Sequence, residues 1–212
     1  MAKTETFSDN FDDNSLSGSW STSTDVGVTI TETGGQLQIS LPNSSPAYGT
    51  IQTFSAYDLT DSFVRCQLVN AGSQTNMDCL PIYISDGGTG NNIFWNVSGG
   101  TCVAHTFIGG VDADRGTNFT YNSALHKFFM IKEVAGTIYW LWSRDGKGWA
   151  THASIATSLT PITSVGIGMQ AGFFGAPGTT TIASFDNFNF SGRASMPINN
   201  LRPHPFSPGI AR

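Results

Sequence analysis

The sequence predicts an all-β protein built as a two-sheet antiparallel sandwich. Short runs of apolar and β-branched residues recur along the 212-residue chain, with glycine-containing turns between them. Within several runs apolar and polar residues alternate, which is the period of a strand with one buried face. Charged residues make up only 12% of the chain, and no segment shows convincing helical spacing. About a dozen short strands without helices are typical of a sandwich or jelly roll.

The individual strands follow from this alternation and from the turns between the runs. Leu37, Ile39 and Leu41 alternate with polar residues after the turn at Gly34-Gly35. The run 127–133 is followed by a turn at Ala135-Gly136 and by the run 137–143. Further strands are predicted over residues 7–11, 28–30, 48–54, 62–69, 79–85, 93–98, 101–108, 164–171 and 182–190. The first and last of these carry the similar strings FSDNF and SFDNF, so we expect the two ends to lie side by side.

The C-terminal segment differs from the rest of the chain. We divide the chain into a β-sandwich domain, residues 1–191, and a proline-rich extended arm, residues 192–212. Proline fixes φ and lacks an amide donor, so this segment fits neither a helix nor a central strand. Burial of its few apolar side chains does not offset the entropy of ordering it, so the arm is either disordered in solution or docked on a partner, and we expect docking. The docking residues are predicted to be Arg202, Pro203, Pro205, Phe206, Pro208, Ile210 and Arg212.

The charge pattern excludes some classes of function. The formal net charge is −5, and the ten basic residues form no stripe, so nucleic-acid binding is not expected. No run of about 18 apolar residues is present, so no membrane insertion is expected. The first residues lack the apolar core of a signal peptide, and we expect synthesis in a cytoplasm.

Several short strings occur in an order that points to a known superfamily. They are residues 9–16 leading to Trp20, then 34–39, 57–59, 143–149 and 185–188. Together they span residues 7–190 and resemble the concanavalin A-like lectin/glucanase superfamily, including its laminin-G-like domains. The resemblance implies a jelly-roll sandwich of two antiparallel sheets, one of them concave.

The final string, RPHPFSPGIAR, is similar to the ending of minor tail proteins of actinobacterial siphophages. This resemblance implies a virion location after synthesis in the host cytoplasm. We therefore expect a non-enzymatic structural virion protein of a bacteriophage, in first place a minor tail or tail-tip component that contacts host surface glycans. Its partners would be other virion proteins and further copies of itself, with a trimer compatible with tail symmetry. The alternatives are a capsid decoration protein and a soluble glycan-binding module.

The acidic residues give no expected catalytic pair. Glucanases of the resembled superfamily use two glutamates on one strand face, two to four residues apart. The only glutamates here are Glu5, Glu32 and Glu133, far apart in sequence, so no catalytic residue is predicted. Asp112 and Asp114 are assigned to a solvated, glycine-flanked turn at 109–116, with a calcium or sugar-contact loop as the alternative.

No cofactor or metal site is predicted. The four histidines, at 105, 126, 152 and 204, show no metal-ligand spacing. Asp9, Asp12, Asp13 and Asp186 could meet if the terminal strands pair, and they then either cap turns or hold a calcium ion. Cys66 and Cys102 are expected to be buried thiols, and a catalytic pair of Cys102 with His105 is the alternative.

Aromatic residues with neighbouring amides suggest a sugar-binding surface, because sugar rings stack on aromatic faces. The predicted glycan-binding residues are Tyr83, Asn92, Trp95 and Asn96. Trp140 and Trp142 form a second aromatic set on one predicted strand. Large aromatic residues on strands are more often core than platform, so at least one of the two sets should be packing.

Overall fold

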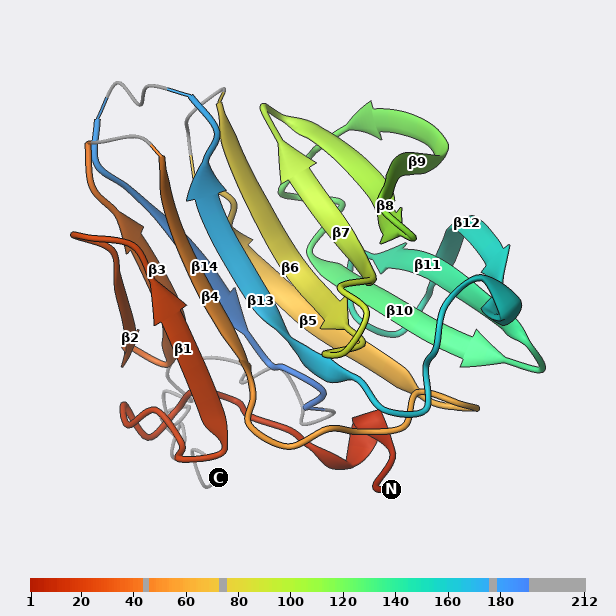
Figure 1. Ribbon diagram of the computed structural model, residues 1–212. Helices are drawn as coiled ribbons and strands as arrows, with labels where there is room; N and C mark the ends of the chain where they lie inside the picture. The colour runs from red at the N-terminus through yellow and green to blue at the C-terminus, as the bar shows by residue number, and fades with distance from the viewer. Residues whose placement is uncertain (44–45, 73–75, 176–178, 191–212) are drawn as a thin grey trace, which may run out of the picture.

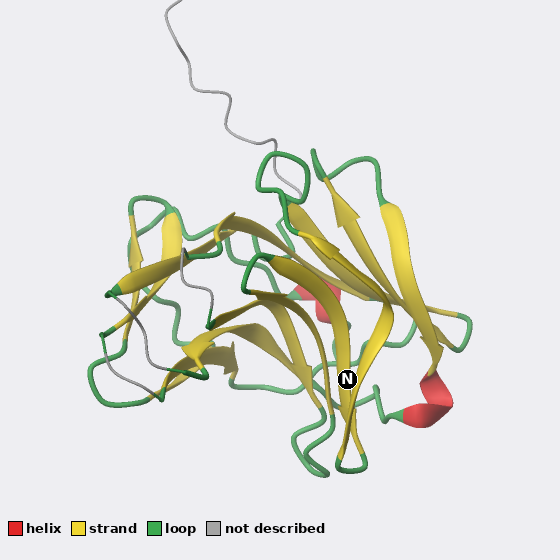
Figure 2. Ribbon diagram, turned by 90° about the horizontal axis from the view of Figure 1, so that it is seen from above, coloured by secondary structure: helices red, strands yellow, loops and turns green. Residues whose placement is uncertain are grey.

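The computed structural model describes residues 1–43, 46–72, 76–175 and 179–190. It contains two stacked seven-stranded sheets in which all neighbouring strands run antiparallel, as Figure 1 shows. The predicted all-β jelly-roll sandwich is therefore confirmed. Seen from above, strands and loops make up nearly the whole fold, with only short helical turns (Figure 2). These turns are η1 (Thr4–Thr6) and η2 (Thr157–Leu159).

The strand order in each sheet is not the order of the sequence. The first sheet runs in the order β1 (Trp20–Thr24), β4 (Ala47–Thr53), β13 (Gly166–Phe173), β6 (Met77–Ser85), β7 (Asn92–Ser98), β8 (Thr101–Ile108) and β9 (Val111–Thr120). The second sheet runs in the order β12 (Ala150–Ala156), β11 (Thr137–Ser143), β10 (Phe128–Val134), β5 (Phe63–Asn70), β14 (Thr181–Asp186), β3 (Gln36–Leu41) and β2 (Thr29–Thr33).

Three parts of the fold differ from the sequence prediction. Residues 109–116 were assigned to a loop, but they contain the start of β9. Gly109 and Gly110 adopt φ of 60° and 79°, so they reverse the chain in two residues and let β9 pair with β8. The ends of the described chain do meet, but through the bridge between Asp9 and Phe188 and through the Asn189 side chain, which donates to the carbonyls of Thr4 and Phe7, rather than through a strand pair. Strands β1 and β12 were not predicted.

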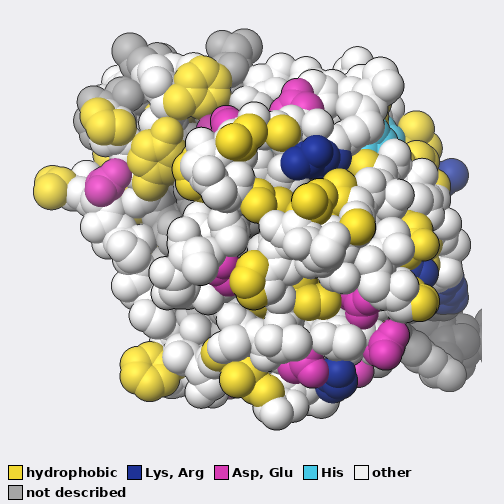
Figure 3. Space-filling view, turned by 45° about the vertical axis from the view of Figure 1, so that its right-hand side comes forward, with side chains coloured by type: hydrophobic (Ala, Val, Ile, Leu, Met, Phe, Trp, Pro, Cys, Tyr) yellow, Lys and Arg dark blue, Asp and Glu magenta, His cyan; other side chains and the backbone are white. Residues whose placement is uncertain are grey.

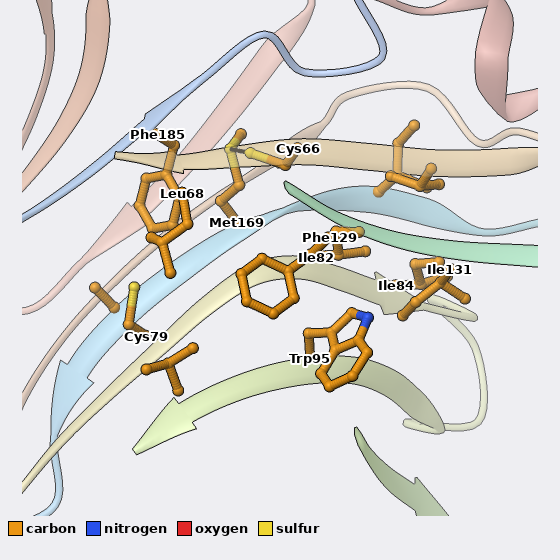
Figure 4. Packing of buried hydrophobic residues seen from close by; sticks show 14 of the residues in the cluster. Cys66, Leu68, Cys79, Ile82, Ile84, Trp95, Phe129, Ile131, Met169 and Phe185 are labelled. Carbon is orange, nitrogen blue, oxygen red and sulfur yellow. Dashed lines mark hydrogen bonds between the residues drawn. The ribbon is translucent and has the colours of Figure 1, made fainter. Parts of the chain in front are cut away.

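The core lies between the two sheets, and two buried tryptophans connect one sheet to the other. Trp95 on β7 and Trp140 on β11 are both fully buried. The indole of Trp95 donates to the carbonyl of Met130 (3.1 Å), and that of Trp140 donates to the carbonyl of Phe94 (2.9 Å). Each sheet thus satisfies an indole of the other, which a buried polar group requires. Figure 4 shows the Phe129 ring beside Trp95, at 5.2 Å between ring centroids.

The three cysteines belong to this core. Cys66, Cys79 and Cys102 are free thiols without exposed surface, as predicted for Cys66 and Cys102. Burial raises the pKa of Cys66 well above its usual value and raises the pKa of Cys102 to about 12. The thiolate is the reactive form, so none of these thiols is suited to nucleophilic chemistry near neutral pH. Cys102 points inward whereas His105 lies on the opposite face of β8, which rules out the pairing of these two residues.

Candidate functional site

A single row of side chains crosses the outer face of the first sheet. Strand pairing aligns its members one beside the next, from β1 to β9: Ser21, Gln52, Gly168, Tyr83, Phe94, His105 and Asp114. On the five inner strands of the sheet their neighbours along the strand are buried, as Trp95 and Ala104 are. Seven strands spaced about 4.8 Å apart make this cross-strand row about 29 Å long.

Glycine is required at one point of the cross-strand row. A Cβ atom at Gly168 would lie 1.9 Å from the carbonyl oxygen of Ile51, which is backbone and cannot move aside. No other residue fits there, so no side chain rises between Gln52 and Tyr83. Gly168 itself is buried, and the Gln52 side chain extends across β13 at Gly166 to donate to Ser85 Oγ at 3.2 Å.

At the β9 end of the row, one imidazole lies between two carboxylates. His105 Nδ1 is 2.8 Å from Asp114 Oδ1, and its Nε2 is within hydrogen-bond distance of Asp112 Oδ1. Asp112 and Asp114 are two residues apart on β9, so both side chains leave the strand on the same face. The imidazole is only 15% exposed, whereas the two carboxylates are 70% and 49% exposed. We refer to these three residues as the Asp–His–Asp cluster.

The hydrogen bonds of the Asp–His–Asp cluster require an additional proton. A neutral imidazole has one N–H and one lone pair, and a carboxylate can only accept. With both ring nitrogens facing carboxyl oxygens, either His105 is doubly protonated or one aspartate carries a proton. Asn118 donates to Asp114 Oδ2 at 2.7 Å. This bond, together with His105, lowers the pKa of Asp114, against the opposing effect of burial. The cluster therefore combines an ionised carboxylate with a transferable proton.

Aromatic and amide side chains continue the site toward the middle of the sheet. The Phe94 and His105 rings lie 4.7 Å apart at 32°, and Tyr83 follows 6.3 Å from Phe94. The Tyr83 hydroxyl donates to Asn92 Oδ1 at 2.8 Å, and Asn96 donates to Asp78 at 2.9 Å. Three of the four predicted glycan-binding residues thus lie on one face, beside the cross-strand row.

The prediction for the fourth residue, Trp95, is wrong. Trp95 is fully buried, because it alternates with Phe94 and Asn96 along β7 and points into the sandwich. A sugar ring cannot reach it. In the second aromatic set, Trp140 is equally buried and Trp142 packs against His126 at 4.7 Å, so both serve packing. The aromatic residue of β7 that faces outward is Phe94.

The sequence does not bring His105, Asp112 and Asp114 together. It predicts a strand around His105, with a pairing to Cys102 as the alternative, and a solvated turn at the two aspartates, with a calcium or sugar-contact loop as the alternative. The signal that could have found them is the Gly109-Gly110 pair, read as a two-residue hairpin turn rather than as part of a loop. With that turn, β9 folds back on β8 and brings Asp114 opposite His105.

The N-terminal aspartates cap turns, which was one of the two alternatives. Asp9 accepts from the amide of Phe11 and from the indole of Trp20, and Asp13 accepts from the amide of Ser15. Glu32 is buried close to Asp13 and Asp9, and this burial is the largest of the causes that raise its pKa. Within the described residues, no three or more His, Cys, Asp or Glu side chains are grouped so that they could hold a metal ion.

Two further histidines lie where the two sheets meet, and their burial predicts that the protein is less stable at acid pH. His126 and His152 pack around Phe119, and burial lowers the pKa of both. In the unfolded chain they bind protons near their usual pKa of about 6.5. We therefore expect the free energy of unfolding to fall as pH drops below about 6.5. The His152→Phe variant should show a shallower fall, measured by urea denaturation between pH 5 and 8.

Asp186→Asn is the control for this pH experiment, because Asp186 has the opposite effect. Burial raises the pKa of Asp186 to about 6 from 3.8. Its contribution to the free energy of unfolding is therefore lost as pH rises from about 4 to about 6. Asp186→Asn should abolish this loss and leave the loss at acid pH that the histidines cause unchanged. If the free energy of unfolding of His152→Phe falls toward acid pH as steeply as that of the wild type, the buried imidazole is not the cause of the fall.

The remaining predictions concern parts of the chain that the structure does not test. The arm residues Arg202, Pro203, Pro205, Phe206, Pro208, Ile210 and Arg212 lie outside the described residues. The domain boundary, the expected homo-oligomer and the virion location stay predictions. Within the described part of the chain, no helix combines the length and the apolar character needed to span a bilayer.

Comparison with known proteins relates the structure to glycan-degrading enzymes. No protein-family model and no curated protein matches the sequence. Solved structures do match. A β-1,3-1,4-glucanase (lichenase) from a mouse hindgut metagenome has a TM-score of 0.64 at 13% identity, over 86% of this chain and 97% of that one. A laminarinase from Flavobacterium has a TM-score of 0.66 at 8% identity, with the same coverage.

A third solved structure is SCLam, a non-specific endo-β-1,3(4)-glucanase from family GH16. Its TM-score is 0.62 at 10% identity, over 86% of this chain and 89% of that one. The fold is a concanavalin A-like jelly roll. Identities this low establish the fold alone, in agreement with the superfamily resemblance of residues 7–190.

These similarities correct the functional expectation. The chain was expected to be a non-enzymatic structural virion protein without catalytic residues. The structural neighbours are glucanases and laminarinases by name, and no virion protein is among the neighbours named here, so the virion assignment is not retained. The phage-like ending has no counterpart in these comparisons.

Proposed function

We propose that this chain hydrolyses a β-linked polysaccharide, bound along the cross-strand row and cleaved at the Asp–His–Asp cluster. The observation that carries the proposal is the imidazole shared by two carboxylates from one strand face. Glycoside hydrolysis needs a proton donor and a second carboxyl group on opposite sides of the scissile bond. The cluster supplies a proton and the ionised Asp114 at the end of an aromatic surface.

The hydrogen bonds assign a role to each group. The proton shared by His105 and Asp112 passes to the glycosidic oxygen, and the bond from that oxygen to the anomeric carbon breaks. A water molecule adds its oxygen to that carbon and gives a proton to Asp114. Asp114 then loses this proton to solvent water, and the pair of His105 and Asp112 takes up one proton from solvent, which restores the starting state. His105 therefore acts together with Asp112 as the proton donor.

The substrate class is inferred from the binding face and from the structural neighbours. Phe94 and Tyr83 can stack on sugar rings, and Asn92 and Asn96 can bind hydroxyl groups. The visible surface in Figure 3 consists largely of uncharged side chains and backbone, with few charged groups. The neighbours act on β-1,3- and β-1,3-1,4-glucans according to their names, so these polymers are the first candidates.

The test is hydrolysis by the full chain. Purified protein is incubated with laminarin, mixed-linkage β-glucan and xyloglucan, and new reducing ends are measured over time. We expect release of reducing ends from at least one polymer. No release from any of them would overturn the proposal.

A further inference from the structure

The opposite end of the cross-strand row contains a hollow that the cleavage site does not use. It lies on the outer face of β1 and β4 and has a volume of about 320 Å³. The side chains that line it are Ser21, Thr22, Ser23, Thr50, Gln52, Thr53 and Phe54. Ser21 and Gln52 are also members of the cross-strand row. The hollow and the Asp–His–Asp cluster therefore belong to one continuous face.

The lining has a definite chemistry. None of its seven residues is ionisable, and the four that share the outer face by alternation, Ser21, Ser23, Thr50 and Gln52, carry a hydroxyl or amide group that can bind a hydroxyl group of a ligand. A charged ligand would lose its hydration there without gaining a counter-charge. An uncharged ligand rich in hydroxyl groups matches the lining, and a neutral sugar ring is such a ligand.

Phe54 supplies the apolar surface that a sugar ring needs. It follows β4 directly and is 82% exposed, which is unusual for a phenylalanine. Its position is nevertheless defined, because its amide donates to the carbonyl of Ser19 at 2.8 Å, next to β1. A sugar ring stacked on Phe54 would direct its hydroxyl groups toward the serine and threonine side chains beside it.

We propose that this hollow is a distal subsite that binds a neutral sugar ring on Phe54, so that the protein prefers long, uncharged glycan chains. The inference rests on the proposed glycan-binding function of the same face. β1 and β9 are six strand spacings apart, or about 29 Å. A chain cleaved at the Asp–His–Asp cluster reaches the subsite only if it spans several sugar units, whereas a trisaccharide held at the cluster does not.

The test compares Phe54→Ala with Phe174→Ala in the full chain. Phe174 is a second exposed phenylalanine, 56% exposed, that follows β13 and lies outside the hollow. For mixed-linkage β-glucan we expect Phe54→Ala to raise KM by up to about tenfold with little change in kcat, because one aromatic contact is lost. For a β-glucan trisaccharide KM should change less than twofold, and Phe174→Ala should alter neither.

Binding without cleavage separates this inference from the proposed reaction. Retardation of the wild type and of both variants is measured in gels that contain mixed-linkage β-glucan or a carboxymethylated β-glucan. We expect the wild type to be retarded by the neutral polymer, Phe54→Ala to be retarded less, and the carboxymethylated polymer to act weakly. If this pattern appears without hydrolysis, the subsite stands and the proposed reaction fails. Equal retardation of wild type and Phe54→Ala, or no retardation at all, overturns the subsite.

Discussion

Replacing Asp114 with asparagine is expected to reduce the rate of polysaccharide hydrolysis by about a hundredfold or more. The substitution keeps the size of the side chain and removes the negative charge that accepts the proton of the attacking water. It also ends the charge-assisted contact with His105 Nδ1, now 2.8 Å long. Asp112→Asn should cause a loss of similar size, because the proton shared with His105 Nε2 no longer has a carboxylate partner.

The two variants should differ in their dependence on pH. Asp114→Asn removes the carboxylate that must be ionised, so the decrease of the rate toward acid pH should be altered. Asp112→Asn removes a carboxylate that holds the donated proton, so the decrease of the rate toward alkaline pH should be altered. The readout is the rate of reducing-end release between pH 4 and 9.

Asp145→Asn is the matched control for both variants. Asp145 is a carboxylate in the turn between β11 and β12, where it accepts from the amides of Lys147 and Gly148. It lies outside the cross-strand row, so its removal should leave hydrolysis unaffected. Full activity in Asp112→Asn and Asp114→Asn would show that the Asp–His–Asp cluster is not the cleavage site.

The largest effect on stability is expected at the two tryptophans that connect the sheets. Trp95→Ala and Trp140→Ala should each lower the free energy of unfolding by about 3–5 kcal/mol. Each substitution leaves a cavity between the sheets, and each also leaves a carbonyl without its indole donor, at Met130 and at Phe94 respectively. Trp140→Ala should also make Phe94 less rigidly held, and the ring of Phe94 is the one that packs against His105.

Urea denaturation at constant pH measures these losses. Val26→Ala is the control, because Val26 is 95% exposed and its truncation should change stability by less than about 0.5 kcal/mol. The phenylalanine variants of both tryptophans should lie between the wild type and the alanine variants. A loss below about 1 kcal/mol in both alanine variants would contradict the role assigned to these side chains.

Much of the fold could be predicted because alternation along a strand records which face is buried. Leu37, Ile39 and Leu41 are all buried, as their spacing indicated. The same rule also places the indole of Trp95 inside; the prediction of exposure was wrong because it followed the amide-rich neighbours rather than the alternation of β7. Strand β12 was missed because its apolar residues are few, and packing of Ala153 and Ile155 against the core decides its place.

The candidate site was predicted only in part. Tyr83, Asn92 and Asn96 were identified because aromatic and amide side chains cluster locally in the sequence. Phe94 and His105 were not, although both belong to predicted strands, because nothing in their own segments indicates what lies beside them. Phe54 was placed at the end of a strand, but its exposure depends on the packing of β1 against β4.

The sequence by itself determined the sandwich class, most of its strands and the burial of the thiols, because these depend on hydrophobic spacing over a few residues. The tertiary structure alone decided that His105 lies between Asp112 and Asp114, and that Ser21, Gln52 and Tyr83 share one row with His105 and Asp114. Such contacts depend on the register between strands. A shift of one residue would turn each side chain to the other face of its sheet, and no short segment encodes the position of its partner.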